Sequence, residues 1–254
     1  MPGWAQKAKQ PFPWPDGKKM ALSLSFDDGR ASQADIGIPF LNQYGVKATF
    51  VVVPSSAEKR LEGWKMAVAT GHEIGNHSLT HPCSGNFPWS QERALEDFTL
   101  EEMRKNLTEA NAEIERMLGV KPTVYAYPCG ATFVGRGKET KSFVPLIADM
   151  FLAGRLWLSE YTNNPNFCDF AQLMGVEMDR KDFSQILPMI QNAQKEGAWL
   201  ILAGHEMGDV DRNQTTRLSM LKDLIEYAQD PKNGIWIAPM GTVAQYVKDH
   251  RKLR

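Results

Sequence analysis

Short apolar segments alternate with longer amphipathic ones along this chain. The apolar segments are mostly unbroken runs bounded by Gly, Asp or Pro, which is typical of parallel strands that are buried on both faces. The predicted strands are Met20–Phe26, Val46–Val53, His72–Asn76, Thr123–Tyr127, Met150–Gly154, Leu173–Met178, Ala198–Gly204 and Ile235–Ala238.

Between the predicted strands, apolar residues recur at three- and four-residue steps, the period of an amphipathic helix. The clearest stripe ends at Gly119, a residue type that favours helix termination, and consists of Leu100, Met103, Leu107, Ala110, Ile114 and Met117. The other predicted helices are Ala31–Tyr44, Glu58–Thr70, Lys138–Asp149, Asp182–Glu196, Thr215–Gln229 and Thr242–Lys252. The longest irregular stretch, Pro82–Glu96, is predicted to be a loop over a site.

This alternation predicts an α/β fold, either a doubly wound sheet or a (β/α) barrel. Polar residues follow the first strand at Asp27–Asp28, the third at His77, the fourth at Pro128–Gly130 and the seventh at His205. A barrel gathers these strand ends around one mouth, whereas an open sheet would set the first and seventh strands apart. We therefore predict a single domain over residues 1–254, built as a distorted (β/α) barrel with seven or so strands.

Composition excludes several other classes of protein. The chain has 254 residues and 43% hydrophobic content, enough for a sizeable core. A formal net charge of −1 gives no basic surface for nucleic acid, and no apolar run approaches the length of a membrane span. The cysteines Cys83, Cys129 and Cys168 form no CxxC pair, and an odd, sparse count argues against a disulfide framework.

The N-terminal segment MPGWAQKAKQPFPWPDGKK is rich in Pro and Lys and lacks the apolar region of a signal peptide. A cytoplasmic location is therefore expected by default, and a secreted or periplasmic location requires that a signal was removed. The sequence leaves the oligomeric state open.

Candidate metal ligands lie in two places, the motif SFDDG and the motif GHEIGNHSLTH. Two imidazoles four residues apart, as at His77 and His81, are expected on the same side of a helical turn, where both can reach one ion. A carboxylate from Asp27 or Asp28 would complete a three-ligand set that leaves positions open for water and substrate. This pattern is typical of a catalytic rather than a structural metal site.

These motifs resemble those of the metal-dependent polysaccharide deacetylases, the NodB-type enzymes of carbohydrate esterase family 4. In family order the chain carries SFDDG, HSLTH, AYPCG and LILAGH, which span Ser25 to His205, and the segments GVKATFVVVP and GHEIGNH are similar to the usual flanks. The resemblance implies a distorted (β/α) barrel with fewer than eight full units. It also implies a divalent metal, usually Zn²⁺ with Co²⁺ or Ni²⁺ as alternatives, and hydrolysis of acetyl groups from amino sugars or sugar esters.

The resemblance also implies a role for each motif residue. Asp28, His77 and His81 would be the metal ligands. Asp27 would be the general base, and His205 would be the general acid that protonates the leaving amine or alcohol.

The third motif departs from the family pattern, which commonly reads Arg-x-Pro-Tyr-Gly. Here the Arg position is Ala126 and the Tyr position is Cys129. Loss of Tyr is tolerable if its contribution is a backbone N–H, so Pro128 and Cys129 are still expected at the substrate, with the Cys129 N–H stabilising the oxyanion. Arg155, after the fifth predicted strand, is expected at the same mouth among the substrate-binding residues, where it would replace the missing Arg beside Asp27.

Three further residues are expected near the site. Arg30 and Arg180 are alternatives to Arg155 for the missing cation. The family's aspartate that orients the acid His is expected at Asp179, at the end of the sixth predicted strand, next to His205.

The predicted function is removal of acetyl groups from N-acetylated or O-acetylated carbohydrate, with N-acetylglucosamine units as the first choice. Two other classes stay open: a metalloamidase acting on a small non-sugar amide such as a ureide, and a catalytically weak sugar-binding barrel. Trp89, Phe87 and Trp157 would stack on sugar rings or simply pack loops against the barrel.

Overall fold

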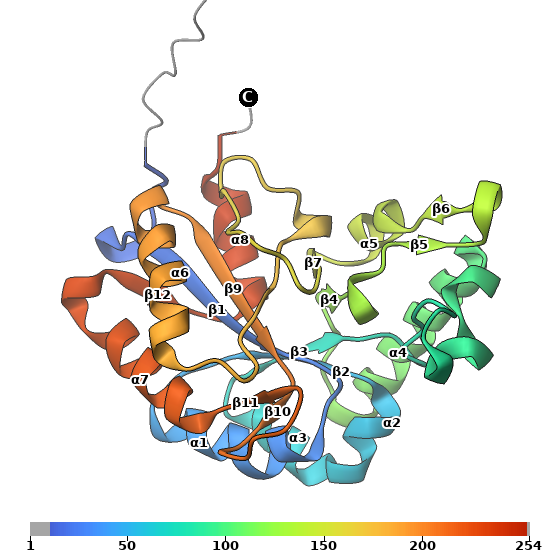
Figure 1. Cartoon of the computed structure of the whole chain (residues 1–254), viewed down its shortest axis with the longest axis horizontal. Coiled ribbons are helices and arrows are strands. Elements are labelled where there is room, and N and C mark those ends of the chain that lie inside the picture. The colour runs from blue at the N-terminus through green and yellow to red at the C-terminus, as the bar shows by residue number, and fades with distance from the viewer. Residues whose placement is uncertain (1–10, 253–254) are drawn as a thin grey trace, which may run out of the picture.

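A curled sheet of parallel strands forms the centre of the molecule, in a computed structural model that describes residues 11–252 (Figure 1). Its strands are β1 Met20–Phe26, β2 Thr49–Val52, β3 Glu73–Asn76, β4 Val124–Ala126, β7 Ala153–Arg155, β8 Val176–Glu177, β9 Trp199–Gly204 and β12 Ile235–Ile237. Seven of them follow one another in the order β7–β4–β3–β2–β1–β9–β8, and β12 pairs with the first residues of β1. Every pairing within this sheet is parallel.

The two outer strands of this order, β7 and β8, approach each other without forming a ladder. One parallel bridge joins Arg155, the last residue of β7, to Leu173, which lies shortly before β8. The sheet therefore curls into a half-barrel that stays incompletely closed. The prediction of a distorted (β/α) barrel with about seven strands is confirmed.

Helices follow most of the strands and surround the sheet (Figure 1). They are α1 Ile38–Gln43, α2 Pro54–Ala57, α3 Leu61–Ala69, α4 Leu100–Leu118, α5 Val144–Met150, α6 Phe183–Glu196, α7 Leu218–Gln229 and α8 Met240–His250. A π-helical segment, Gln33–Gly37, leads directly into α1. Two small sheets lie outside the barrel, one of β5 Phe133–Val134 with β6 Lys141–Ser142 and one of β10 Glu206–Met207 with β11 Thr215–Thr216.

Helix α4 follows the predicted pattern closely. A capping box between Thr99 and Glu102 satisfies its first N–H groups, and Gly119 ends it in the left-handed conformation (φ 68°). Five members of the predicted stripe are buried, namely Met103, Leu107, Ala110, Ile114 and Met117, whereas Leu100 in the first turn is 37% exposed.

Strand β1 lies at the centre of the sheet, and all of its residues are buried. Met20, Leu22, Leu24 and Phe26 pack into the larger hydrophobic cluster with residues of α1, α3, α6 and α7. The alternate positions are small, and two of them bind side chains of other strands: Ser23 accepts a hydrogen bond from Trp199 Nε1 of β9 (3.0 Å), and Ser25 accepts one from Arg155 Nε of β7 (3.0 Å). Small residues on this face leave room for a buried arginine behind the carboxyl end of β1.

Two predicted helices differ from the structure. The helix expected over Lys138–Asp149 begins only at Val144, because the preceding residues form the β5–β6 hairpin, whose connection uses the left-handed Gly135 and Gly137. The expected helix Ala31–Tyr44 is divided into the π-helical segment and α1, with Pro39 in the first turn of α1. None of the helices within residues 11–252 combines the length and apolarity needed to cross a membrane.

Candidate active site

The two acidic residues after β1 stand where the chain leaves the sheet. The Asp27 N–H still donates to the Gly204 carbonyl of β9 (2.9 Å), and the backbone then turns through left-handed conformations at Asp28 (φ 75°) and Gly29 (φ 70°). Neighbouring strand residues point to opposite faces. This turn allows both carboxylates to reach one rim.

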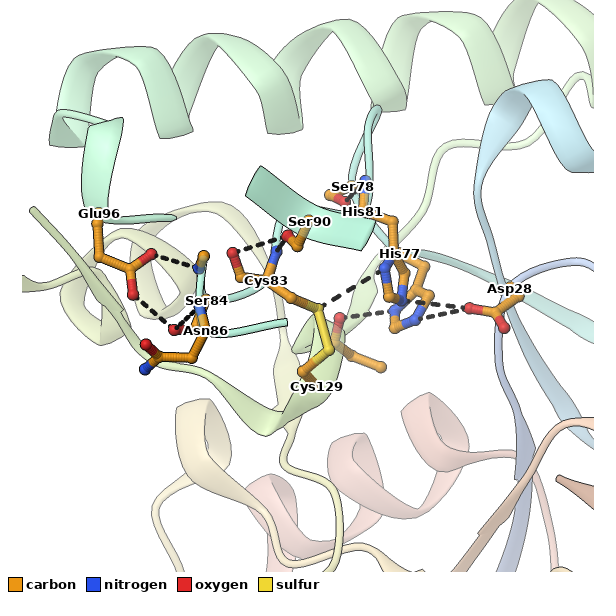
Figure 2. The surroundings of a disulfide bond; sticks show 12 residues. Asp28, His77, Ser78, His81, Cys83, Ser84, Asn86, Ser90, Glu96 and Cys129 are labelled. Atoms are coloured by element: carbon orange, nitrogen blue, oxygen red, sulfur yellow. Dashed lines mark hydrogen bonds and ion pairs between the residues drawn. A yellow bond between two sulfur atoms is a disulfide. The ribbon is translucent and has the colours of Figure 1, made fainter. Parts of the chain in front are cut away.

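Asp28, His77 and His81 lie together as the sequence predicted (Figure 2). Asp28 Oδ1 is 3.3 Å from His77 Nε2 and 3.4 Å from His81 Nε2. In a tetrahedral site with bonds of about 2.0–2.1 Å, neighbouring ligand atoms are separated by roughly 3.3 Å. One carboxylate oxygen and two imidazole nitrogens are also donors that zinc and related divalent ions accept. The donor set therefore fits a divalent metal.

The helical-turn explanation for the His77 and His81 spacing is wrong. Strand β3 ends at Asn76, and the following turn contains left-handed residues at Ser78 (φ 67°) and His81 (φ 51°). Side chains hold this turn: Asn76 Oδ1 accepts from the Ser78 N–H (2.6 Å), and Ser78 Oγ accepts from the His81 N–H (2.9 Å). Both imidazoles reach Asp28 from a side-chain-stabilised loop.

The protonation states of this group suit metal binding. The Nδ1–H of His77 donates to the Ala126 carbonyl (2.9 Å), and this hydrogen bond turns Nε2 toward Asp28. Burial, followed by the nearby charge of His77, lowers the pKa of His81 to about 4, which leaves this ring neutral at pH 7. Burial opposes ionisation of Asp28, yet the hydrogen bond and charge of His77, with the charge of Arg30, hold the pKa of Asp28 well below its usual range.

Arg30 binds the second oxygen of the Asp28 carboxylate. Its Nε and Nη2 lie 2.8 Å and 2.7 Å from Asp28 Oδ2, and its Nη2 also donates to Gln214 Oε1 (2.7 Å). Glu206 Oε1 is 3.4 Å away on the other side of the guanidinium. Arg30 therefore pairs with Asp28 and does not replace the missing arginine beside Asp27.

Arg155 supplies the cation beside Asp27. It reaches from the end of β7, is fully buried, and donates to Asp27 Oδ1, to Ser25 Oγ (3.0 Å) and to the Leu156 carbonyl (3.2 Å). It lies behind Asp27 and not among the residues that line the cavity. Arg180, the other alternative, pairs with Asp211 (3.8 Å) at the surface.

His205 lies after β9 and is held by Asp179. The His205 Nδ1 is 2.7 Å from Asp179 Oδ2, and Asp179 Oδ1 accepts from the His205 N–H (3.1 Å) and from Thr216 Oγ1 (2.7 Å). Burial by itself lowers the pKa of His205, but the hydrogen bond to Asp179 and the charges of Asp27 and Asp179 outweigh it and raise this pKa above its usual value. The edge of Trp157 packs on the imidazole, with ring centroids 4.7 Å apart.

One cavity of about 750 Å³ brings these groups together, a size typical of small-ligand sites. It is lined by residues of both predicted acid–base positions and all three predicted ligands, namely Asp27, Asp28, His77, His81 and His205, together with Cys129, Trp157 and Trp89. Pro128 is buried and not among its lining residues, although it was expected at the substrate. Trp89 is 51% exposed, lies 6.1 Å from His81 between ring centroids, and stacks on Phe87 (5.4 Å).

A disulfide joins Cys83 to Cys129, so the expectation that the cysteines form no disulfide is wrong (Figure 2). The two residues are 46 positions apart, Cys83 lies outside the motifs, and the motif AYPCG that contains Cys129 does not signal the pairing. Cys83 Sγ lies 3.8 Å from His81 Nδ1, whereas Cys129, in a left-handed turn (φ 56°), is exposed at the cavity. The bond therefore ties the loop after His81 to the turn of the third motif.

The family model of the polysaccharide deacetylases matches residues 15–141, half of the chain. This chain belongs to the polysaccharide deacetylase family. The matched part contains the Asp27–Asp28 pair, both histidines of the candidate metal group and both disulfide cysteines.

Individual relatives agree with this assignment. The chain is 30% identical over 128 residues to a peptidoglycan-N-acetylglucosamine deacetylase of Bacillus cereus, which covers 50% of this chain and 42% of the relative. It spans between 5% and 42% of the length of the first four curated relatives that it matches.

Solved structures share the fold at low sequence identity. A Mycobacterium smegmatis protein assigned to the polysaccharide deacetylases has a TM-score of 0.67 at 18% identity, with 98% of this chain and 97% of that chain covered. A family 4 acetyl xylan esterase from Clostridium thermocellum, solved with a cobalt ion, has a TM-score of 0.58 at 19% identity, covering 90% and 92% of the two chains.

Replacement of Arg155 by Met should destabilise the protein strongly. The substitution leaves the Asp27 carboxylate buried without its cation, which costs about 3–5 kcal/mol of unfolding free energy. Chemical denaturation measures this loss. Arg180→Met, which breaks an exposed ion pair, is the matched control and should cost less than about 1 kcal/mol. Equal stability of Arg155→Met and the wild type would contradict the buried pair.

Reduction of the disulfide should also lower stability. The bond closes a loop of 46 positions, and loop-closure entropy for that length corresponds to about 4 kcal/mol. Denaturation with and without a dithiol reductant measures the difference, and Cys83→Ser should reproduce the reduced protein. Cys168→Ser should leave the reductant effect intact, because Cys168 is outside the disulfide. A denaturation midpoint that is the same with and without reductant would mean that the disulfide does not form.

Proposed function

We propose that this chain is a metal-dependent hydrolase that removes acetyl groups from N-acetylated or O-acetylated carbohydrate, with residues 1–254 acting as one catalytic domain. A single observation carries the proposal. The Asp28, His77 and His81 group shares one cavity with a buried carboxylate that is paired with arginine, Asp27, and with a histidine held by a carboxylate, His205.

Asp28, His77 and His81 hold the ion in this proposal. A bound divalent ion polarises the acetyl carbonyl and lowers the pKa of water. Zn²⁺ is the first choice because it accepts nitrogen and oxygen donors at open tetrahedral sites, and Co²⁺ or Ni²⁺ are alternatives. The Arg30 guanidinium occupies Asp28 Oδ2, so Oδ1 is the oxygen turned toward the imidazoles.

Asp27 acts as the general base. The hydrogen bonds of Arg155 to Asp27 and Ser25 fix the carboxylate in a buried position (2% exposed) at the cavity. A water in the cavity can therefore transfer its proton to a carboxylate that is already oriented.

His205 acts as the general acid. Its raised pKa favours the protonated ring, and Asp179 holds Nδ1, so the proton at Nε2 is available to the leaving nitrogen or alcohol. The backbone N–H of Cys129, at the rim of the same cavity, is the proposed donor to the oxyanion.

Acetylated amino sugars suit this cavity best. The exposed Trp89 face provides an apolar surface of the kind on which sugar rings stack, and the Bacillus cereus relative is named for action on peptidoglycan N-acetylglucosamine. A disulfide persists in oxidising compartments, where cell-wall polymers are found. The altered third motif suggested a small non-sugar amide, but Arg155 supplies the missing cation, so this reason no longer favours a metalloamidase.

Acetate release tests the proposed function. The panel consists of peptidoglycan, chitin oligomers, poly-N-acetylglucosamine and acetyl-xylan, each with and without chelator, and a ureide is included as a small amide. We expect acetate from at least one carbohydrate, lost with chelator and restored by Zn²⁺ or Co²⁺. Cleavage of the ureide alone would select the metalloamidase, and oligosaccharide binding without any acetate would select the sugar-binding barrel.

Replacement of Asp27 by Asn should abolish turnover while the metal stays bound. The general base contributes a factor of about 10²–10⁴ to the rate, and the amide keeps the shape of the side chain. His77→Ala provides the contrast, because it should lose both metal and activity. Metal analysis and acetate release on both variants measure the two effects. Full activity of Asp27→Asn would refute the base assignment.

Replacement of Asp179 by Asn should move the alkaline limb of the pH–activity profile to lower pH. The Asp179 carboxylate raises the pKa of His205, so its loss lets the acid deprotonate at lower pH. Profiles of kcat/KM measure the shift, with the exposed Asp182→Asn as the control. An alkaline limb that stays in place would exclude His205 as the acid held by Asp179.

A further inference from the structure

The hydrogen-bonded ladder between β1 and β9 ends at the active site. Its last bond is the one from the Asp27 N–H to the Gly204 carbonyl (2.9 Å). Beyond it the segments that follow β1 and β9 separate, because Asp28 turns away in a left-handed conformation and Glu206 begins β10. The carbonyls of Asp27 and His205 are thus the first acceptors past the end of the ladder, on residues that are themselves buried.

One side chain binds both of these carbonyls. The amide nitrogen of Gln33 donates to the Asp27 oxygen (2.6 Å) and to the His205 oxygen (2.9 Å), and Gln33 has no exposed surface. The two acceptors determine which end of the amide faces them, since an amide oxygen at these distances from two carbonyls would be repelled. Both hydrogens of the amide are therefore used in joining β1 to β9.

The position of the Gln33 side chain is energetically unfavourable in one respect. Its Oε1 is buried without a hydrogen-bond partner among the described residues, an unfavourable state for an amide oxygen. Gln33 also begins the π-helical segment Gln33–Gly37, a rare conformation that occurs frequently at functional sites. The residue just before the segment is also held, because Ser32 Oγ accepts from the Met207 N–H of β10 (3.0 Å). A side chain used only to fill space would need neither feature.

We infer that Gln33 is a positioning residue that sets the separation between Asp27 and His205. This inference rests on the proposed function, in which these two residues are the base and the acid. Gln33 does not line the cavity and is not hydrogen-bonded to the side chains of Asp28, His77 or His81. Gln33 acts on Asp27 and His205 only through their main-chain carbonyls. Its side-chain amide forms one further connection, or rung, beyond the last backbone bond of the ladder.

Gln33→Met tests the inference, because Met has a similar length and fills the space without a donor. Loss of the rung should displace the base relative to the acid and lower kcat by roughly 10–100-fold, since misplacement by about 1 Å can cost 10²-fold. KM and the affinity for Zn²⁺, measured by competition with a chelator, should stay within twofold of the wild type. Normal kcat in Gln33→Met would overturn the inference.

Ser23→Ala is the matched control. Ser23 also connects β1 to β9, through Trp199 Nε1 (3.0 Å), and it donates to the Ala238 carbonyl (2.8 Å), but it lies away from the cavity. If Gln33 acts only by stabilising the strand pair, Ser23→Ala will lose as much kcat as Gln33→Met at equal loss of melting temperature. A selective loss of kcat in Gln33→Met supports positioning.

Crystal structures of both variants keep the inference separate from the proposed function. We expect the ends of β1 and β9 to move apart at Asp27 and His205 in Gln33→Met and to stay in place in Ser23→Ala. Unchanged positions in Gln33→Met would overturn the positioning role whether or not the wild type releases acetate. Absence of acetate from the wild type, with the ends displaced in the variant, would instead contradict only the proposed function.

Discussion

The whole site depends on the contacts of the Asp28 carboxylate, because its two oxygens face different partners. One oxygen faces the two imidazoles of the loop after β3, and the other is held by Arg30. The position of β1 makes this possible, since β2 and β3 lie on one side of it and β9 lies on the other. Strand order therefore places the histidines and His205 on opposite sides of the same carboxylate pair.

Two losses in the third motif are offset by residues from elsewhere in the chain. The missing arginine has its counterpart in Arg155. This residue extends from β7 past Ser25, on the face of β1 with small side chains, to Asp27. The missing tyrosine is replaced by Cys129, whose disulfide to Cys83 attaches the turn to the loop that follows His81. In both cases the partner lies outside the third motif. Arg155 places a positive charge beside Asp27, and Cys83 holds the turn at Cys129.

The sequence predicted the strands and their common rim well, because buried parallel strands read as unbroken apolar runs and site residues follow strand ends directly. Arg155 and Asp179 could be selected from their positions at strand ends together with the family resemblance, which called for a cation and an aspartate. The disulfide could not, because only the fold brings Cys83 and Cys129 together. The pairing of Arg30 with Asp28 and the rung made by Gln33 were also missed, since both depend on left-handed and π-helical backbone that the hydrophobic period does not encode. The spacing of His77 and His81 correctly predicted that both imidazoles lie near Asp28, but the helical turn assumed for that prediction is a loop.

The most direct measurement is a crystal structure of the protein soaked with Zn²⁺, recorded at wavelengths on both sides of the zinc absorption edge. The account predicts one anomalous peak within about 2.0–2.2 Å of Asp28 Oδ1, His77 Nε2 and His81 Nε2. No zinc peak at these three atoms, at saturating zinc and neutral pH, would contradict the metal site and the hydrolytic function built on it.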